Sequence, residues 1–168
     1  MSDQNKALTP ELSRSATRLN HRKLRSAPWN HQGKHPGSPI VWRLFRLMVI
    51  LGHKIIFRRS KSDKVPPVDG GRISVSTHIN GLVDPLVIVN SQERRFTALG
   101  RHDLVTRPLI GWWCRALGIQ PILRRVEMTE GITDSEFAKF INQRSMLTVS
   151  NCISAGYSAI VFPEGTSH

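Results

Sequence analysis

The chain has 168 residues, 39% of them hydrophobic, and its 24 Lys and Arg against 12 Asp and Glu leave a formal net charge of +12. This length suits a single domain that buries about two-thirds of its unfolded surface, and the positive excess predicts anionic partners: phosphates, nucleic acid or an anionic lipid surface. The two cysteines, Cys114 and Cys152, lack metal-ligand spacing and fall in predicted helices. We therefore expect reduced core thiols rather than a disulfide or a metal site.

Residues 1–37 combine high charge with almost no apolar run. They hold seven Lys and Arg, two acids and three of the histidines. Such a segment buries too little surface to offset the entropy lost on ordering, so we interpret it as a disordered basic arm. It lacks the apolar core and cleavage site of a secretory signal, while its Arg- and Ser-containing composition leaves a transit peptide as the alternative.

Residues 38–60 form the next segment, which is mostly apolar and contains PIVWRLFRLMVILGHKIIFRR. Arg43, Arg46 and Lys54 interrupt it. The longest uninterrupted apolar run, Leu47–Leu51, is far shorter than the about 20 residues needed to cross a bilayer. The pattern predicts an amphipathic helix in the membrane interface, with apolar side chains in the headgroup boundary and cations at the phosphates. A helix packed on its own domain is the alternative.

Strand and helix signals alternate from residue 61 to the end. Strands are predicted at residues 72–77, 95–99, 119–124 and 157–162, and helices start near residues 84, 106 and 133. Asp84 is the predicted N-cap of the first of these helices, and Gly118 and Gly156 are the predicted ends of the other two. The alternation predicts an α/β fold with a mixed sheet and crossover helices, preceded by the amphipathic helix. Pro121 favours an edge position or a bulge for the third strand.

The stretch STHINGLVDPLV follows the first predicted strand and contains His78 and Asp84. A carboxylate folded back across the short loop would fix the tautomer of the imidazole and leave its second nitrogen free to take a proton. Ordinary turn chemistry between a strand and a helix explains the same residues, because a loop histidine is more often a surface residue than a base. The pair is therefore a candidate that needs a second motif.

That second motif is IVFPEGTSH, with which the chain ends. Glu164, Gly165 and Thr166 follow an apolar, β-branched strand, so a carboxylate, a glycine and a hydroxyl meet at the edge of the sheet. Crevices beyond the carboxyl ends of strands are where α/β proteins bind ligands. Since His78 follows its own strand at the same end, we expect the two motifs to face one crevice.

The order H-x5-D-P, then G-x-x-P-x-x-R, then F-P-E-G-T resembles the glycerolipid acyltransferase family, over the region from about Trp42 to His168. The family includes the glycerol-3-phosphate and 1-acylglycerol-3-phosphate acyltransferases. The resemblance implies that His78 is the general base for a glycerol hydroxyl attacking an acyl thioester, and that Asp84 orients it. It also implies that Arg124 holds the phosphate of the acceptor.

The third motif is likewise assigned by the resemblance to acceptor binding, through Glu164, Gly165 and Thr166. Five residues separate His78 from Asp84, where the commonest spacing in the family is four. Members resembling the glycerol-3-phosphate and dihydroxyacetone-phosphate enzymes share the longer form and have an asparagine like Asn80. We therefore expect acylation of the first hydroxyl, with 1-acylglycerol-3-phosphate as the alternative acceptor.

The family continues beyond its third motif with a further strand, helices and a fourth motif, none of which follows in this sequence. We therefore expect residues 61–168 to be the N-terminal part of an acyltransferase domain, in a fragment or a naturally truncated chain. The resemblance implies no metal and no cofactor other than the donor, acyl-CoA or acyl carrier protein. The expected location is the cytosolic face of a membrane, without a full transmembrane span.

Three other functions account for part of the pattern. The charge alone fits a nucleic-acid-binding protein, but no zinc-binding, helix-turn-helix or RNP-type motif is present, so no nucleic-acid partner is expected. A non-catalytic basic fragment that binds an anionic membrane is the second alternative. A thioester hydrolase is the third; it needs no phosphate ligand, so Arg124 would then be dispensable.

Overall fold

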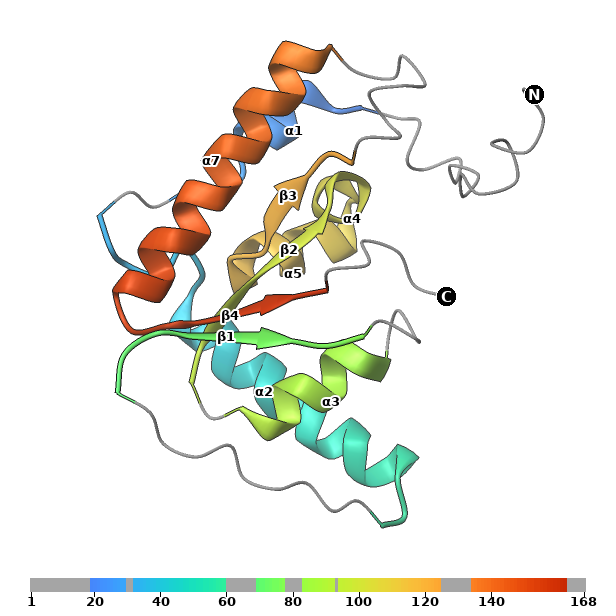
Figure 1. Ribbon diagram of the computed structural model, residues 1–168. Coiled ribbons are helices and arrows are strands. Elements are labelled where there is room, and N and C mark those ends of the chain that lie inside the picture. Colours follow the sequence, from blue (N-terminus) through green and yellow to red (C-terminus); the bar gives the residue numbers. More distant parts are fainter. Residues whose placement is uncertain are drawn as a thin grey trace, which may run out of the picture.

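The computed structural model describes residues 19–29, 32–59, 69–77, 83–92, 94–124 and 134–162. In this part of the chain a four-stranded sheet lies between two layers of helices (Figure 1). The strands are β1 (Arg72–Val75), β2 (Phe96–Arg101), β3 (Gln120–Ile122) and β4 (Ser158–Val161). The helices are α1 (His21–Arg25), α2 (Pro39–Ile56), α3 (Val83–Ser91), α4 (His102–Thr106), α5 (Leu109–Leu117) and α7 (Ser135–Ser154).

The strands lie in the order β1-β4-β2-β3 and every described pairing is parallel. The predicted α/β fold with crossover helices and a preceding helix is confirmed. The described sheet is parallel throughout rather than mixed, because each crossover helix returns the chain to the edge at which the previous strand began. Pro121 lies in β3, at the end of this strand order, as its missing N–H predicted.

The crossover helices cover opposite faces of the sheet. α3 and α5, which carry the chain from β1 to β2 and on to β3, share a core with α2 that includes Val89, Leu117 and Ile160. α7, which carries the chain back to β4, packs with α1 in a second core around Ile141. Right-handed crossovers require this change of face when the direction of travel across the sheet reverses. β4 thereby becomes an interior strand, with Ala159 and Ile160 almost fully buried.

Residues 19–29 and 32–37 differ from the disordered arm expected there. α1 packs on the domain: Leu24 is fully buried with Leu123 and Phe137, and the Nζ of Lys23 donates a hydrogen bond to the carbonyl of Thr106 at 2.9 Å. Leu24 and the other apolar residues here, Leu19 and Trp29, are scattered through a basic segment, which is a weak sequence signal. The partners that bury Leu24 are about a hundred residues away in the chain, so periodicity could not indicate the contact.

His35 is a further buried residue of the expected arm. Its Nδ1 accepts a hydrogen bond from the backbone N–H of Gly37 at 3.0 Å. The ring therefore carries its proton on Nε2, which donates to the carbonyl of Phe96 at 2.9 Å. Burial lowers the pKa of His35 from its ordinary value. The imidazole thus joins the chain before α2 to the start of β2 as a neutral group.

α2 begins where the sequence indicates, since the side chain of Ser38 caps it and Pro39 follows at the first position. Trp42 and Val49 are buried on its inner face, and the ring of Trp42 meets that of Phe96 edge-on at 4.9 Å. The outer face is exposed. Among the described residues, no helix has both the length and the apolar character required to cross a bilayer.

Some helix ends lie where the sequence predicts them, and one differs by a residue or two. Gly118 is the C-cap of α5, and Gly156 directly follows Ala155, the C-cap of α7; both glycines have positive φ, as expected at helix ends. α7 is capped by Asp134. α3 already includes Val83, so Asp84 lies in its first turn instead of at the N-cap. A shift of one or two residues is usual at helix ends, and a carboxylate in the first turn is stabilised by the helix dipole.

The cysteines are reduced core thiols, as predicted. Cys114 and Cys152 are both free and buried. Burial raises the pKa of each thiol to about 11.

Candidate active site

The carboxyl edge of the sheet is where the described strands that precede the three sequence motifs end. Because the strands are parallel, the segments that follow β1, β3 and β4 all leave from this edge. β1 and β4 are neighbours and pair Val75 with Val161, so the first and third motifs start from adjacent strand ends. His78, Asn80, Glu164, Gly165 and Thr166 themselves lie outside the described residues.

Asp84 is brought to this edge by α3. The helix runs back along β1 (Figure 1), so its first turn lies at the carboxyl ends of the strands. Asp84 is half-buried there. A half-buried carboxylate at a helix start can accept hydrogen bonds while its negative charge is stabilised by the helix dipole. The described fold therefore places Asp84 at the carboxyl end of β1, the strand that the first motif follows in the sequence.

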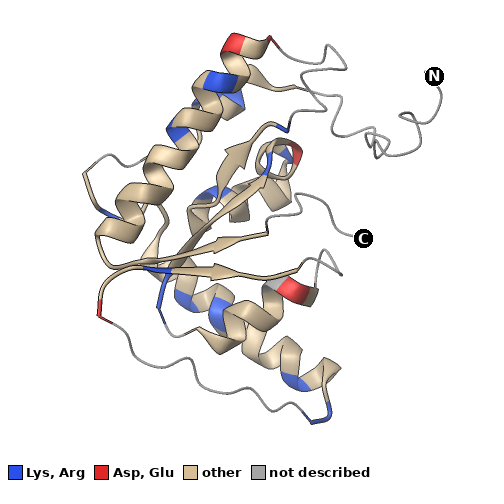
Figure 2. Cartoon of the chain, in the orientation of Figure 1, with Lys and Arg blue, Asp and Glu red and all other residues tan. Residues whose placement is uncertain are grey.

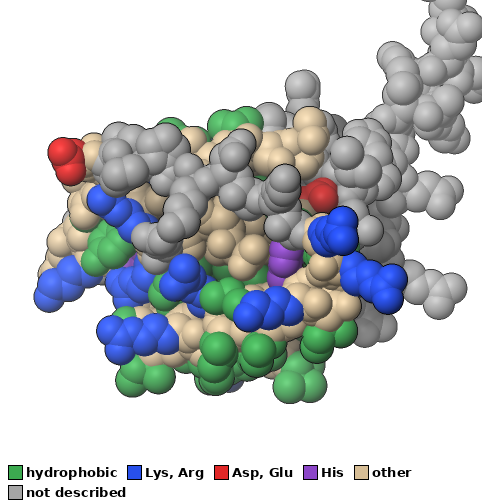
Figure 3. Space-filling model, turned by 90° about the horizontal axis from the view of Figure 1, so that it is seen from below, with side chains coloured by type: hydrophobic (Ala, Val, Ile, Leu, Met, Phe, Trp, Pro, Cys, Tyr) green, Lys and Arg blue, Asp and Glu red, His purple; other side chains and the backbone are tan. Residues whose placement is uncertain are grey.

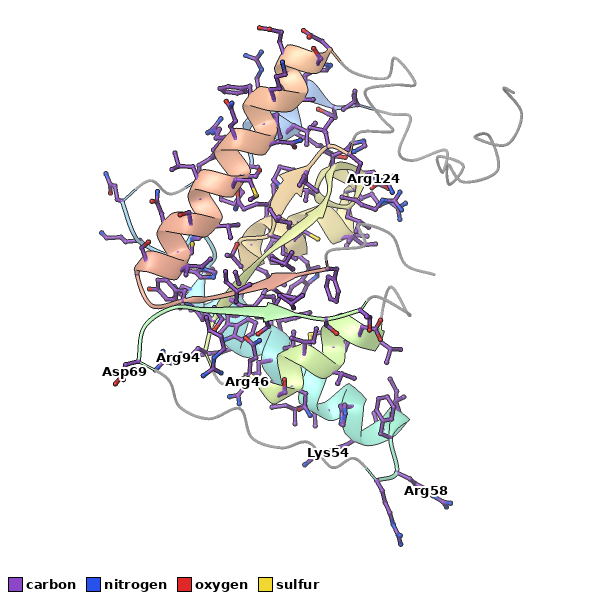
Figure 4. All side chains as sticks on the ribbon, viewed as in Figure 1. Arg46, Lys54, Arg58, Asp69, Arg94 and Arg124 are labelled. Atoms are coloured by element: carbon purple, nitrogen blue, oxygen red, sulfur yellow. The ribbon has the colours of Figure 1, made fainter. Side chains whose placement is uncertain are left out.

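Arg124 follows β3 at the same edge and is half-buried (Figure 4). The backbone directly before it is held by α7. The side chain of Asn142 accepts from the N–H of Leu123 at 2.9 Å and donates to its carbonyl at 2.8 Å. The Oγ of Ser145 donates to the carbonyl of Pro121 at 2.6 Å. These contacts replace the missing strand neighbour of β3 and position the residue that follows.

Asn142 and Ser145 are functional-site residues that were not predicted from the sequence. A signal for them was present: Ser145 lies one helical turn from Ile141 and Val149, and Asn142 lies one turn from Ala138, all apolar residues that α7 buries. Polar side chains on the buried face of a helix require partners, and at this sheet edge the unpaired backbone of β3 supplies them.

A second group missed in the sequence is the cluster at the end of β2. Asp103 is 2% exposed and receives two hydrogen bonds from Arg101, at 3.0 and 3.1 Å. The guanidinium of Arg107 lies 3.5 Å from its second oxygen. His102, between them in sequence, is fully buried. Two half-exposed arginines around one buried carboxylate leave the carboxyl edge cationic beside Arg124, which suits a phosphate.

The spacing of the strands sets the size of the site. β1 and β3 are separated by β4 and β2. At about 4.8 Å per strand, roughly 14 Å separates the strand that leads to His78 from the strand that leads to Arg124. The strand ends that lead to the first motif and to Arg124 are therefore not neighbours in the sheet. A ligand that lies across the edge can contact residues that follow both strands.

The fold is that of an α/β protein whose parallel strands end at one edge, the place where such folds bind ligands. A family model described as Acyltransferase matches residues 42–168, which is most of the chain. The chain therefore belongs to the acyltransferase family, and acyl transfer is the reaction of its class. The match begins within α2 and includes all three motifs. Comparison with curated proteins and with solved structures found no match.

Proposed function

We propose that this acyltransferase moves a fatty acyl group from acyl-CoA or acyl carrier protein to a hydroxyl of glycerol 3-phosphate or a related phosphate acceptor. The observation that carries the proposal is the convergence of the segments after β1, β3 and β4 on one sheet edge, in a chain of the acyltransferase family. That edge combines the chemistry required: a candidate base after β1, and cations after β2 and β3.

In the proposed reaction His78 takes the proton from the acceptor hydroxyl while its oxygen attacks the thioester carbonyl carbon. The tetrahedral intermediate then collapses, the carbon–sulfur bond breaks, and the imidazolium returns the proton to the leaving thiolate. Asp84 orients the imidazole and stabilises its charged form. The acceptor alcohol is itself the nucleophile, so the reaction requires no acyl-enzyme and no serine or cysteine nucleophile.

Arg124 is proposed to bind the acceptor phosphate, together with Asn80 and the segment Glu164–Thr166. The position of Arg124 supports this role, because Arg124 follows β3, which lies roughly 14 Å from β1 across the sheet edge. An extended arginine and a phosphate-bearing acceptor can bridge that separation, with the hydroxyl end toward His78. The planar guanidinium donates two parallel hydrogen bonds to phosphate oxygens, which a lysine cannot do.

Thiol release from palmitoyl-CoA, with and without glycerol 3-phosphate, tests the proposal in the full-length product of the gene. Acceptor-dependent release that is abolished in His78→Ala is expected. Arg124→Ala should raise the KM for glycerol 3-phosphate by roughly 30-fold or more and leave that for palmitoyl-CoA nearly unchanged, since a charge-assisted phosphate contact is worth about 2 kcal/mol. Arg22→Ala, at an exposed arginine of α1, is the matched control.

The same assay separates the alternatives. Release that occurs equally without an acceptor would identify a thioester hydrolase, and Arg124 would then be dispensable. A preference for 1-acylglycerol 3-phosphate would place the reaction at the second hydroxyl. No release with any acceptor would leave a non-catalytic protein and refute the proposed function.

A further inference from the structure

The outer face of α2 carries a continuous apolar stripe. Its members recur every three or four residues, which aligns them along one side of the helix. They are between 50% and 84% exposed: Ile40, Leu44, Leu47, Met48, Leu51 and Ile55. The opposite side of α2 is already buried in the domain through Trp42 and Val49. Contiguous exposed apolar surface of this kind marks an interaction site, because leaving it in water is costly.

A cationic groove borders this stripe. It has a volume of about 590 Å³ and contains the guanidinium-bearing side chains of Arg43, Arg46 and Arg95 beside Leu47 and Ile50. Since Leu47 belongs to both, the groove and the stripe form one surface. The groove lies at the start of α2 and just before β2, so it is at the amino edge of the sheet, away from the candidate active site.

The arginines of the groove lack anions of their own. Among the described residues, neither Arg43 nor Arg46 has an ion pair or a hydrogen-bonded partner, and the Nε of Arg46 is shielded from water without one. Arg95 is held in place by the carbonyl of Gly37 at 3.4 Å and by the ring of Tyr157. A partly desolvated, unpaired guanidinium is costly, and an anion bound in the groove would remove that cost.

The surrounding surface has the same sign of charge. Arg46, Lys54, Arg58 and Arg94 lie along the lower side of the molecule (Figure 4), and α2 contains no Asp or Glu. Along that side the described acids appear only at its ends, on α3 and before β1 (Figure 2). Seen from below, the cationic side chains lie in a band with hydrophobic ones along its margin (Figure 3).

We propose that the outer face of α2 docks on an anionic lipid bilayer, with the apolar stripe in the headgroup boundary and the groove of Arg43, Arg46 and Arg95 holding a lipid phosphate. Cations directly beside an apolar stripe match the order of layers in a bilayer surface, where phosphates lie just outside the acyl chains. A nucleic acid offers phosphates but no apolar layer for an aliphatic stripe. A second copy of the chain would bring like charges together at the groove.

Docking in this way would orient the enzyme. α2 ends, and α3 begins, on the side toward which the strands point (Figure 1). A bilayer that covers α2 would therefore lie next to the carboxyl edge of the sheet, where a long acyl chain can leave the site without crossing water. The docking surface goes beyond the proposed function, because it predicts lipid binding whether or not glycerol 3-phosphate is the acceptor.

Flotation of the full-length protein with phosphatidylcholine vesicles, containing or lacking phosphatidylglycerol, tests the cationic groove. Each cation near an anionic surface contributes roughly fivefold to binding, so Arg43→Gln/Arg46→Gln should weaken binding to the anionic vesicles about 30-fold. The control Arg22→Gln/Lys139→Gln removes the same charge from exposed residues of α1 and α7, which cover the other face of the sheet. Its effect should be less than about threefold. Equal losses in the two double variants would overturn the proposal.

The apolar stripe is tested by a second double variant and its matched control. Leu47→Ser/Leu51→Ser should weaken vesicle binding by about tenfold or more. Met146→Ser/Leu147→Ser changes two side chains of α7 that are exposed to the same degree, and binding should be retained. Circular dichroism melts verify that all variants are folded. Unchanged binding in the α2 variants, or binding of duplex DNA tighter than of anionic vesicles, would refute the bilayer as the partner.

These outcomes are independent of the reaction. Thiol release from a short-chain, water-soluble acyl-CoA should remain in the α2 variants, because none of the substituted residues lies at the carboxyl edge. If vesicle binding fails while acceptor-dependent release persists, the docking surface is wrong and the proposed function stands. If thiol release is absent while vesicle binding follows the predicted pattern, the proposed function is wrong and the docking surface stands.

Discussion

Replacing Leu24 by alanine is expected to destabilise the protein although the residue lies in a basic segment outside the family match. Leu24 has no exposed surface and packs with Leu123, Phe137 and Ile141. The substitution removes three carbon atoms from this core, at about 0.8 kcal/mol each, and leaves a cavity. We expect the free energy of unfolding to fall by about 3 kcal/mol, and the melting temperature by roughly 10 °C for a chain of this length.

Two measurements separate global from local effects. Urea denaturation followed by circular dichroism gives the free energy of unfolding. Trypsin cleavage within α1 reports detachment of the helix alone, because Arg22, Lys23 and Arg25 are all cleavage sites there. In Leu24→Ala the rate of cleavage at these residues should rise even where the domain remains folded.

The control is Leu44→Ala, a leucine of the same size that is 50% exposed on α2. Its cost should remain below about 1 kcal/mol, since little packing is lost. If Leu24→Ala costs no more than this control, and α1 of the unchanged protein is cleaved as fast as an unfolded peptide, then α1 does not pack on the domain. The interpretation of residues 1–37 as a disordered arm would then be restored.

Gly37→Ala should destabilise by about 2 kcal/mol or more, measured by thermal melting, because the new Cβ would lie 2.5 Å from backbone atoms at the end of α5. Gly52→Ala, in the open interior of α2, should instead stabilise by about 0.5–1 kcal/mol. His35 has a lowered pKa in the folded protein, so its contribution to the free energy of unfolding is complete above pH 6.5, the ordinary pKa of the unfolded state. That contribution is lost as the pH falls through the lower pKa of the folded state. In urea titrations between pH 7 and 5, His35→Gln should lose less stability than the unchanged protein. Burial raises the pKa values of Cys114 and Cys152 to about 11. Both should therefore react with a thiol reagent at pH 8 only after urea is added. Rapid labelling of the folded protein would contradict their burial.

Much of the fold was predictable from the sequence because its signals are local. The capped start of α2, the glycine ends of α5 and α7 and the alternation of strands with helices all depend on neighbouring residues. α4 was missed because five residues are too few to show a periodicity. The all-parallel sheet was missed because strand direction is decided by the path of the crossovers, not by the composition of any strand.

The candidate site was likewise predictable where its signals are local and hidden where it depends on contacts distant in sequence. The types and order of the motif residues are visible in the sequence, and they indicate the acyltransferase family. That Arg124 is positioned by Asn142 was not visible, because the contact links an edge strand to a helix. The buried ion cluster around Asp103 was likewise hidden, since an R-H-D sequence is equally compatible with an exposed loop.

The sequence by itself determined the residue chemistry of this protein: an ordered set of motifs, an amphipathic α2 and a strong positive charge. The tertiary structure decided which strand ends lie side by side, since parallel pairing of β1 with β4 depends on contacts between residues 72–75 and 158–161. It also decided that one face of α2 is buried by the domain while the apolar stripe is left exposed beside the groove that Arg43, Arg46 and Arg95 line. Helical periodicity shows that α2 has distinct faces, but only the packing of the other helices selects which of them remains open to a partner.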